Sequence, residues 1–384
     1  MSKLQDLITQ LCPDGVEYVK LDDVAPPTRG VRVIRSQLSL EGEYPVYQNS
    51  MTPLGYYGES NCPANTAFVI SAGAAGEVGY STVEFWAADD CFYFVCPDNL
   101  QSRFLYYALM CQREYLLSRV RRASVPRLAR SVIEGLKIPL PPLPVQSEIV
   151  RILDNFTELT AELTAELTAE LTARKKQYEY YRNELLTFSN SNDAPMVTLG
   201  EIGRVAMCKR IMKAETTPDG DVPFYKIGTF GKAPDAYISA ETYERYKQDY
   251  SYPQKGDVLI SAAGTIGRTV IFDGEPAYYQ DSNIVWLEHD GSQVLNKYLF
   301  YCYQLSPWHI STGGTIARLY NDNITKAKIP LPSLDEQARI VAILDKFDAL
   351  TTDISIGLPA EIAARQKQYE YYRDKLLTFK EKAA

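Results

Sequence analysis

Hydrophobic and polar residues follow two different patterns along the chain, and each pattern occurs twice. Residues 1–145 and 191–334 are rich in aromatic and β-branched residues, interrupted by glycine and proline, which is typical of short strands and turns. Residues 146–188 contain no glycine or proline, and Ile149, Leu153 and Phe156 begin an apolar series at helical spacing. This pattern predicts one helix of roughly 65 Å.

The helical pattern returns 191 residues later without a gap. Residues 137–188 (KIPLPPLPVQSEIVRILDNF…QYEYYRNELLTF) match residues 328–379 (KIPLPSLDEQARIVAILDKF…QYEYYRDKLLTF). Weaker matches precede each copy: residues 69–76 resemble 259–267, residues 44–47 resemble 222–225, and residues 19–21 resemble 197–199. The chain is therefore expected to contain one α/β fold twice, each copy with its own surface and each followed by a helical region.

The second helical region differs from the first at one point. Where residues 158–174 of the first read ELTAELTAELTAELTAR, the second contains Gly357 and Pro359. Glycine and proline end one helix, and proline is favoured in the first turn of the next. We expect two helical pieces here, packed antiparallel against the unbroken first helix around a pseudo-two-fold axis.

The repeated four-residue sequence Thr-Ala-Glu-Leu, which we call the tetrad, places leucine at 159, 163, 167 and 171 and glutamate at 158, 162, 166 and 170. Glutamates four residues apart repel one another, so burial of the leucines against residues 335–355 or their continuation is expected to hold this helix. Four helical residues advance about 6 Å and turn about 40° beyond a full circle. A plain packing segment would account for the repeat, but the duplication favours a spacer between two related modules on a regular lattice such as duplex DNA.

Composition excludes several classes of protein. No apolar run is long enough to cross a bilayer, and the N-terminus has no secretory pattern. The seven cysteines show no C-x-x-C pair, which favours reduced thiols in a cytoplasmic protein over a metal site. We expect no metal and no cofactor on this chain.

The net charge of −8 hides a basic segment. No lysine or arginine occurs from Ser36 to Ser102, whereas between Arg103 and Lys137 eight basic residues are opposed by Glu114 and Glu134 only. This segment can bind a polyanion although the whole chain is acidic, but a solvated basic face would have the same composition.

The order of these parts resembles the specificity subunit of type I restriction–modification systems over essentially the full length. The resemblance is carried by the paired Lys-Ile-Pro-Leu-Pro segments (137–141, 328–332), by Gln146 and Gln337 after them, by Ile-Leu-Asp at 152–154 and 343–345, by Gln-Tyr-Glu-Tyr-Tyr-Arg at 177–182 and 368–373, and by the tetrads. Residues 12–18 and 256–261 match within the globular parts.

The resemblance implies a division into target-recognition domain 1 (1–145), a central conserved helix with tetrad repeats (146–190), target-recognition domain 2 (191–334) and a C-terminal conserved helical region (335–384). Each recognition domain would read one half of a bipartite DNA site. The helices would set the spacer and bind two modification subunits, which carry S-adenosylmethionine, and motor-nuclease restriction subunits would join through the complex. The chain itself would be no enzyme.

Two alternatives remain open from the residues. A self-contained methyltransferase or nuclease is disfavoured because no Asn-Pro-Pro-Tyr/Phe segment or phosphate loop is found. Gly73, Gly76, Gly264 and Gly267 fit tight hairpin turns better than a nucleotide site, because the context of a dinucleotide-binding fold is absent. A helical scaffold without DNA binding would keep the helical regions and lose the salt-dependent binding of duplex DNA.

Arginine and lysine side chains are the candidates for DNA contact, because they neutralise phosphates and read guanine. Arg127 and Arg318 share a position at offset 191, which suggests a phosphate contact common to both domains. Arg121, Arg122 and Arg130 have no basic counterpart and are candidates for reading one half-site, and Arg29, Arg32 and Arg35 are comparable. In the second domain the candidates are Lys209, Arg210, Lys213 and Arg268. For each of these a structural role on the surface is at least as well supported.

Overall fold

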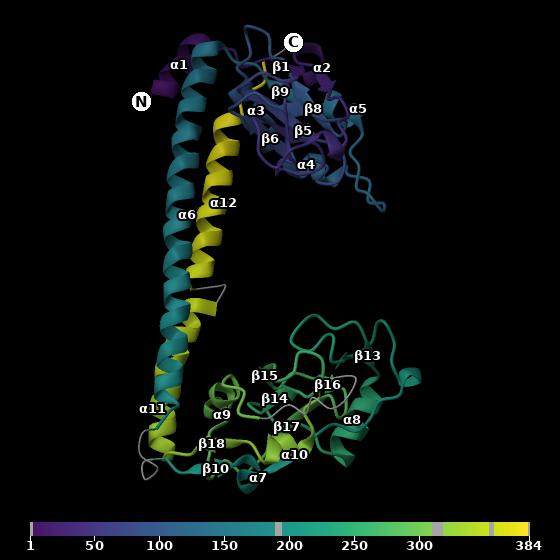
Figure 1. Ribbon diagram of the computed structural model, residues 1–384, viewed down its shortest axis with the longest axis vertical. Helices are drawn as coiled ribbons and strands as arrows, with labels where there is room; N and C mark the ends of the chain where they lie inside the picture. The colour runs from purple at the N-terminus through teal and green to yellow at the C-terminus, as the bar shows by residue number, and fades with distance from the viewer. Residues whose placement is uncertain (1–2, 189–193, 309–317, 353–356, 383–384) are drawn as a thin grey trace. The chain divides into compact units, whose positions relative to one another are not determined.

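The computed structural model describes residues 3–188, 194–308, 318–352 and 357–382. It consists of two compact units: unit 1 comprises Met1–Thr168 and Glu361–Ala384, and unit 2 comprises Ala169–Ala360. Each unit contains one globular body, which we name body 1 (residues 3–142) and body 2 (residues 194–333). The helices outside the bodies form helical region 1 (residues 143–188) and helical region 2 (residues 334–379) (Figure 1).

The two bodies contain the same three sheets in the same strand order. In body 1 the orders are β2-β8-β5-β6, β4-β3-β7 and β1-β9, and in body 2 they are β11-β17-β14-β15, β13-β12-β16 and β10-β18. The strands of body 1 are β1 (Tyr18–Lys20), β2 (Pro27–Arg29), β3 (Tyr44–Tyr47), β4 (Tyr56–Tyr57), β5 (Thr66–Ile70), β6 (Val78–Ser81), β7 (Trp86–Ala87), β8 (Cys91–Phe94) and β9 (Lys137–Pro139). Those of body 2 are β10 (Met196–Thr198), β11 (Arg204–Ala206), β12 (Val222–Tyr225), β13 (Tyr237–Ile238), β14 (Val258–Ser261), β15 (Thr269–Ile271), β16 (Tyr278–Tyr279), β17 (Ile284–Glu288) and β18 (Lys328–Pro330).

Short helices complete each body. Body 1 has α1 (Lys3–Leu11), α2 (Leu21–Val24), α3 (Ser102–Cys111), α4 (Arg113–Ser118), α5 (Arg130–Glu134) and the 3-10 turn η1 (Arg35–Gln37). Body 2 has α7 (Leu199–Ile202), α8 (Ala240–Asp249), α9 (Asn296–Tyr303), α10 (Asn321–Thr325) and the 3-10 turn η2 (Lys213–Glu215). The predicted duplication of one α/β fold is confirmed, because the weak sequence matches fall on the equivalent pairs β1 and β10, β3 and β12, and β5 and β14.

The cores explain why the weak matches persist. Strand β5 contains the apolar run 67–70 and all five of its residues are buried, and the equivalent β14 is buried throughout as well. Helices α3 and α9 cover these strands and contribute the fully buried Phe104 and Tyr298. A central strand that is covered on both faces must remain apolar, whereas the loops that it supports are free to diverge.

The paired glycines make tight turns, as predicted. Gly73 and Gly76 lie between β5 and β6 with φ of +77° and +89°, and Gly264 and Gly267 lie between β14 and β15 with φ of +66° and +80°. A Cβ atom on Gly73 would lie 2.6 Å from the carbonyl oxygen of Asn49. The backbone conformation at all four positions favours glycine, and at Gly73 the close approach of the main chain does so as well.

Helical region 1 is the single helix α6 (Leu143–Leu185), drawn as one continuous ribbon in Figure 1. It begins three residues before the predicted start, because Pro144 is accommodated in the first turn, where no backbone N–H is needed. Leu143–Thr168 belong to unit 1 and Ala169–Leu185 to unit 2. Helical region 2 consists of α11 (Leu334–Thr352) and α12 (Leu358–Leu377). The predicted restart is confirmed, since Pro359 lies in the first turn of α12.

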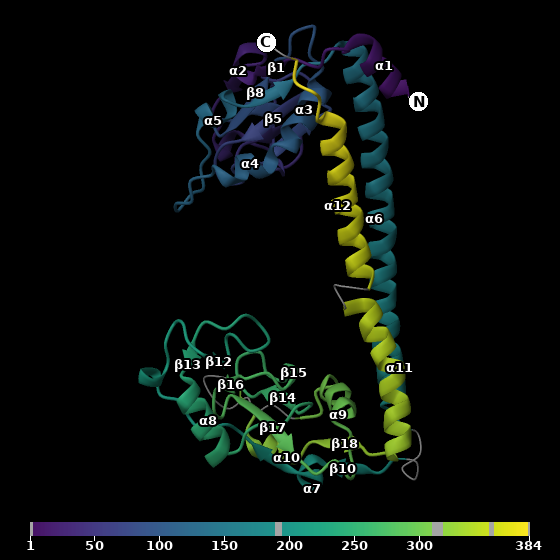
Figure 2. The ribbon, with the colours of Figure 1, turned by 180° about the vertical axis from the view of Figure 1, so that it is seen from behind.

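Within each unit α6 packs antiparallel against one piece of helical region 2. In unit 1 Phe156 contacts Tyr372 with ring centroids 6.2 Å apart, and Leu163 lies with Arg365 along the same groove, so α12 runs opposite to α6 (Figure 2). In unit 2 Tyr181 stacks on Phe347 of α11 at 5.5 Å.

The tetrad leucines are less buried than expected. Leu159 is 61% exposed, and Leu163, Leu167 and Leu171 are only half-buried, while all four glutamates are exposed. Leu159 and Leu163 face α12, the continuation that was predicted, but this chain alone does not enclose them. A repeat of exactly four residues rotates away from a 3.6-residue period, so successive leucines cannot all face one neighbouring helix.

The C-terminal segment ties α12 to body 1. The Val16 amide donates to the Lys380 carbonyl at 2.8 Å, and the Lys382 amide donates to the Val16 carbonyl at 3.0 Å. Helix α1 lies nearby on the start of α6, where hydrogen bonds from Arg151 and Lys3 lower the pKa of Glu148 to about 2. Body 1 is therefore bound both by the helix that follows it and by the end of the other helical region.

Two leucines of α6 provide a matched test of this packing. Leu153 is fully buried in the core of unit 1, whereas Leu159 is 61% exposed. We expect Leu153→Ala to lower the free energy of unfolding by about 2–5 kcal/mol. Leu159→Ala should change it by no more than about 0.5 kcal/mol, because little area is buried there. Urea unfolding followed by circular dichroism measures both, and equal losses would contradict the packing described.

Candidate nucleic-acid interface

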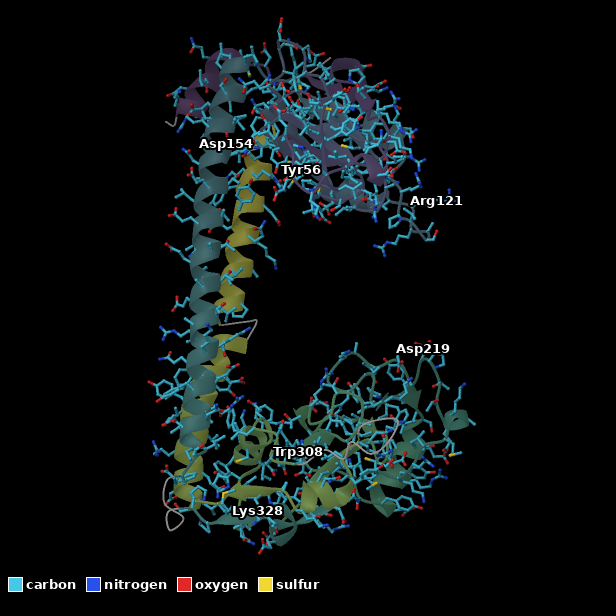
Figure 3. All side chains as sticks on the ribbon, in the orientation of Figure 1. Tyr56, Arg121, Asp154, Asp219, Trp308 and Lys328 are labelled. Atoms are coloured by element: carbon cyan, nitrogen blue, oxygen red, sulfur yellow. The ribbon has the colours of Figure 1, made fainter. Side chains whose placement is uncertain are left out.

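A basic β-hairpin projects from body 1 at residues 121–127. The Arg121 amide donates to the Arg127 carbonyl at 2.8 Å, and the reverse bond is 3.1 Å. The base of the hairpin is held because the Leu128 amide donates to the Ser71 carbonyl at 2.8 Å and the Leu128 side chain is buried. Figure 3 labels Arg121 on this projection. The DNA major groove admits a two-stranded β-ribbon, and this hairpin, closed by one antiparallel bridge, is a short projection of that type.

The side chains of the hairpin tip are free to bind a partner. Residues 121–125 are all exposed, including Val125 at 48%. The guanidinium groups of Arg121 and Arg122 make no ion pair or side-chain hydrogen bond with any residue that the structure describes. Two unpaired cations beside an exposed apolar side chain suit contact with phosphates and base edges.

Arg127 and Arg318 have a common intramolecular role. Arg318 is half-buried, and its Nη2 donates to the Ser282 carbonyl at 2.7 Å, just before β17. Arg127 Nη1 lies 3.7 Å from Asp90 Oδ1, just before the equivalent strand β8, and its side chain is 64% exposed. Both arginines connect their loop to the turn before the same strand. The fold thus offers its own reason for the shared position, and the predicted contact of these arginines with phosphate stays a prediction.

Arg130 and Arg268 are also engaged within their bodies. Arg130 Nε donates to Glu134 Oε1 at 2.6 Å, one helical turn away in α5. Arg268 is half-buried and its Nη1 donates to the Phe230 carbonyl at 2.9 Å. These two side chains hold local structure, so they are less available to a ligand than the hairpin arginines.

The other candidates of body 2 differ in whether their charged groups contact another side chain. The Lys209 ammonium lies over the Tyr250 ring, 4.8 Å from its centroid, and Arg210 Nε lies 3.2 Å from Asp281 Oδ2. Lys213 is exposed on η2, and its ammonium has no partner among residues 3–188, 194–308, 318–352 and 357–382.

The 3-10 turns reveal an equivalence that sequence reasoning missed. Arg35 is the first residue of η1 and Lys213 is the first residue of η2. The side chains of Gln37 and Glu215 accept from the amides of Ile34 and Met212 at 3.0 and 2.7 Å, so both turns are closed in the same way. Each body thus presents an exposed cation at one structural position. The signal in the sequence was a basic residue followed two positions later by Gln or Glu, which is too short to be noticed without the structure.

Two buried thiols and one histidine of the bodies have local partners or surroundings that define their state. Burial raises the pKa of the Cys208 thiol to about 12 and the pKa of the Cys91 thiol well above its usual value, so both remain protonated. The His289 ring is engaged by Asn296 at 2.7 Å, whereas His309 lies outside the described residues. Within the described part of the chain no group of three or more His, Cys, Asp or Glu side chains could hold a metal ion. No described helix is both long and apolar enough to span a membrane.

Comparison with known proteins agrees with this arrangement. The family model described as the type I restriction modification DNA specificity domain matches residues 13–173 and again residues 192–364. A putative type I restriction enzyme specificity subunit of Haemophilus influenzae is 50% identical over 380 residues, covering 95% of this chain and 96% of the relative. The EcoR124I/EcoR124II specificity subunit of Escherichia coli is 37% identical over 264 residues, 63% of each chain.

Solved structures support the fold. A chain from a study of complex assembly and conformational transition of the type I restriction–modification system matches with a TM-score of 0.69 at 17% identity, covering 96% of this chain and 98% of that one. The specificity subunit from Thermoanaerobacter tengcongensis matches with a TM-score of 0.53 at 18% identity, covering 96% of each. The duplicated family match, which spans most of both bodies and part of each helical region, shows that the chain belongs to the family of type I restriction–modification DNA specificity subunits, the non-catalytic subunits that give these systems their DNA sequence specificity.

Proposed function

We propose that each body reads one half of a bipartite DNA site through the loops that carry its exposed cations. The observation that carries this proposal is that two bodies with identical strand order differ in the set of exposed cations that their described loops carry. The same scaffold with different contact residues is what recognition of two unlike half-sites requires. Body 1 presents the hairpin of residues 121–127, and body 2 presents η2 together with Lys209 and Arg210.

The candidate residues fall into two groups, according to whether their charged groups already have partners within the body. Arg121 and Arg122 are the proposed base-reading residues of body 1, and Arg127 is a proposed phosphate contact because its ion pair is long and exposed. In body 2 we assign DNA contact to Lys213 first, and then to Lys209 and Arg210, because Lys209 contacts an exposed tyrosine ring and the Arg210 side chain stays 69% exposed beside Asp281. Arg130, Arg268 and Arg318 act in this scheme mainly by holding the loops in place.

The hairpin proposal is tested with Arg121→Ala and Arg122→Ala in the complex of this chain with its modification subunits. Loss of a bidentate contact to guanine should weaken binding by about 1–3 kcal/mol and relax the requirement at one base pair. Loss of a phosphate contact should instead reduce the salt dependence of binding by about one counterion. Fluorescence anisotropy at several salt concentrations, with cognate and singly altered duplexes, separates the two cases.

The matched control is Arg130→Ala, which removes a cation that is already paired with Glu134 in the same body. We expect it to change affinity by less than about threefold at physiological salt. If Arg130→Ala weakens binding as much as Arg121→Ala and Arg122→Ala do, the hairpin has no special role and the assignment fails.

The helical regions are the proposed docking surface for two modification subunits, through which the restriction subunits join. Tyr180 and Tyr371 are equivalent residues at offset 191, and they are 60% and 61% exposed. Exposed tyrosines on a helix are favoured in protein interfaces, and their occurrence once in each unit suits two copies of one partner. S-adenosylmethionine is expected on those partners, and the complex is expected to act in the cytoplasm, where its DNA is found.

The domain boundaries follow from the same proposal. Residues 1–145 and 191–334 are the two recognition domains, and residues 146–190 and 335–384 are the conserved helical regions between and after them. Helix α6 supports the first boundary, because it begins at Leu143, just after strand β9 and the proline-rich exit (residues 139–142).

A further inference from the structure

A fully buried glutamine stands where helical region 1 leaves body 1. Gln146 lies in the first turns of α6 and has no exposed surface. Its Oε1 accepts from the Gln101 amide at 2.9 Å, at the start of α3. Its Nε2 donates to the Asn99 and Pro141 carbonyls, both at 2.8 Å. One side-chain amide thus connects a turn of the body, the proline-rich exit and the helix.

Unit 2 contains the same construction. Gln337 is fully buried at the corresponding place in α11. Its Oε1 accepts from the Leu295 amide at 2.9 Å, at the start of α9, and its Nε2 donates to the Gln293 and Pro332 carbonyls, both at 2.9 Å. The hydrogen-bonding pattern is identical in two bodies whose sequences otherwise differ widely, so the pattern is a property of the junction and not of one body.

The partners of both glutamines are main-chain groups only. A primary amide supplies two donors and an acceptor in one plane, a set that no other side chain of this size offers except the shorter asparagine. Because the hydrogen bonds of these glutamines use only the backbone of the body, side chains of the body can change without disturbing them. Buried main-chain groups that lost these partners would remain unsatisfied, so the geometry is strongly enforced.

A second anchor follows eight residues further along each helix. In unit 1 Asp154 Oδ1 accepts from Arg103 Nε at 2.8 Å and from the Tyr107 hydroxyl at 2.6 Å, both on α3 (Figure 3 labels Asp154). In unit 2 Asp345 pairs with Lys297 at 3.2 Å and accepts from the Tyr301 hydroxyl, both on α9. Eight helical residues correspond to about 12 Å and lie on one face of a helix.

We propose that Gln146 and Gln337, each with its second anchor, are positioning residues that fix the direction in which each body is held on its helix. With one anchor the body could rotate about that point, whereas two anchors on one face of the helix define the orientation of the body. A rotation of about 10° at the junction would move groups about 30 Å away by roughly 5 Å, which exceeds the rise of one base pair. The junctions thereby determine how strictly the complex discriminates between spacer lengths. This inference rests on the proposed reading of a bipartite site.

The test uses Gln146→Met and Gln337→Met in the complex with the modification subunits. Methionine keeps the length of the side chain and removes all three hydrogen bonds. Competition binding is measured for duplexes with unchanged half-sites and with spacers one base pair longer or shorter than the preferred one. We expect the preference for the native spacer to fall by about fivefold or more while the preferred half-site bases stay the same, because preorganisation is lost and the reading loops are untouched.

The matched control separates orientation from stability. Ile133 is fully buried in body 1, in α5 away from the junction. The control is Ile133→Ala or Ile133→Val, whichever lowers the thermal midpoint of unfolding by the same amount as Gln146→Met. It should weaken binding to duplexes of every spacer length alike and keep the discrimination between spacer lengths. Equal loss of discrimination in the control overturns the inference, because the effect would then follow stability alone.

A milder pair of variants covers the case in which the methionine variants do not fold. Asp154→Asn and Asp345→Asn keep the size of the outer anchors, which are partly exposed, and should reduce discrimination in the same direction. If these variants, or folded methionine variants, discriminate spacers as the unchanged complex does, the inference is wrong and the bipartite reading stands. If the unchanged complex itself shows no spacer preference, the expectation that the helical regions set the spacer fails and the inference fails with it.

Discussion

Deletion of Thr168–Leu171 is expected to shorten the preferred spacer by one or two base pairs and to leave both half-site sequences unchanged. Removal of four residues from the continuous helix α6 brings its two ends about 6 Å closer and turns them by about 40° relative to one another. On B-DNA this corresponds to slightly less than two base pairs of rise and about one base pair of twist.

The structure indicates that α6 tolerates this deletion. The tetrad glutamates are exposed and none of the tetrad leucines is fully buried, so little core is lost. Because the four-residue sequence is repeated, each residue near the deletion keeps neighbours of the same types along its own helix. The half-sites are read by the bodies, whose loops lie outside the deleted segment, and we therefore expect their base preferences to persist.

The effect on the original spacer should be large. If one body can no longer reach its half-site, two or more base contacts worth about 1–3 kcal/mol each are lost, which amounts to roughly 10²–10⁴-fold in affinity. Binding of the complex to a series of duplexes with different spacers measures both the loss and the new optimum. A length-neutral control, Glu166→Gln with Glu170→Gln, should leave the optimum unchanged. Altered half-sites with an unaltered spacer would show that α6 does not set the spacing.

Exchange of residues 1–145 for the corresponding segment of a relative is expected to change one half of the DNA target and to preserve the other half. Body 1 is attached to α6 and to the C-terminal segment by main-chain hydrogen bonds at Gln146 and Val16, and by apolar side chains that share one core with α6. The main-chain bonds do not depend on the side chains of the incoming body, so a segment that keeps the apolar positions of this core should dock in the same way. Body 2 lies in a separate compact unit with its own cores.

Sequencing of methylated positions in a host that carries the complete system measures the exchange directly. The original half-site read by body 1 should disappear completely, and a new one should take its place at the same side. Exchange of residues 191–334 is the reciprocal experiment, and it should alter only the opposite half. If either exchange alters both halves, the two bodies do not read independently.

Much of the architecture was predictable because it depends on local rules. The repeat at offset 191 predicted two bodies with one fold, and identical strand orders confirm it. Proline in the first turn is compatible with a helix start, so the break before Pro359 was readable from the sequence. The hairpin glycines were readable for a similar reason, since a left-handed backbone conformation excludes most other residues.

The candidate interface was less predictable because charge alone does not show where a side chain is engaged. The sequence offered Arg268 and Arg318 as DNA contacts in the same way as Arg121 and Arg122, by charge and position alone, yet the first two donate to main-chain carbonyls within body 2. Those carbonyls, at Phe230 and Ser282, are 38 and 36 residues away along the chain. No local pattern announces a partner at that separation. The burial of the tetrad leucines was overestimated for a related reason. Helical periodicity shows which residues share one face of a helix, but it does not show whether another element packs on that face.

By itself, the sequence determined the duplication, the unbroken first helical region, the divided second one and the family, because each follows from spacing, backbone preference or identity between segments. Only the tertiary structure decided which cations remain unpaired, that η1 and η2 present equivalent basic residues, and that Gln146 and Gln337 connect body to helix. These features arise from atoms that meet across long stretches of chain, and their energies depend on distance and burial, which no linear pattern contains.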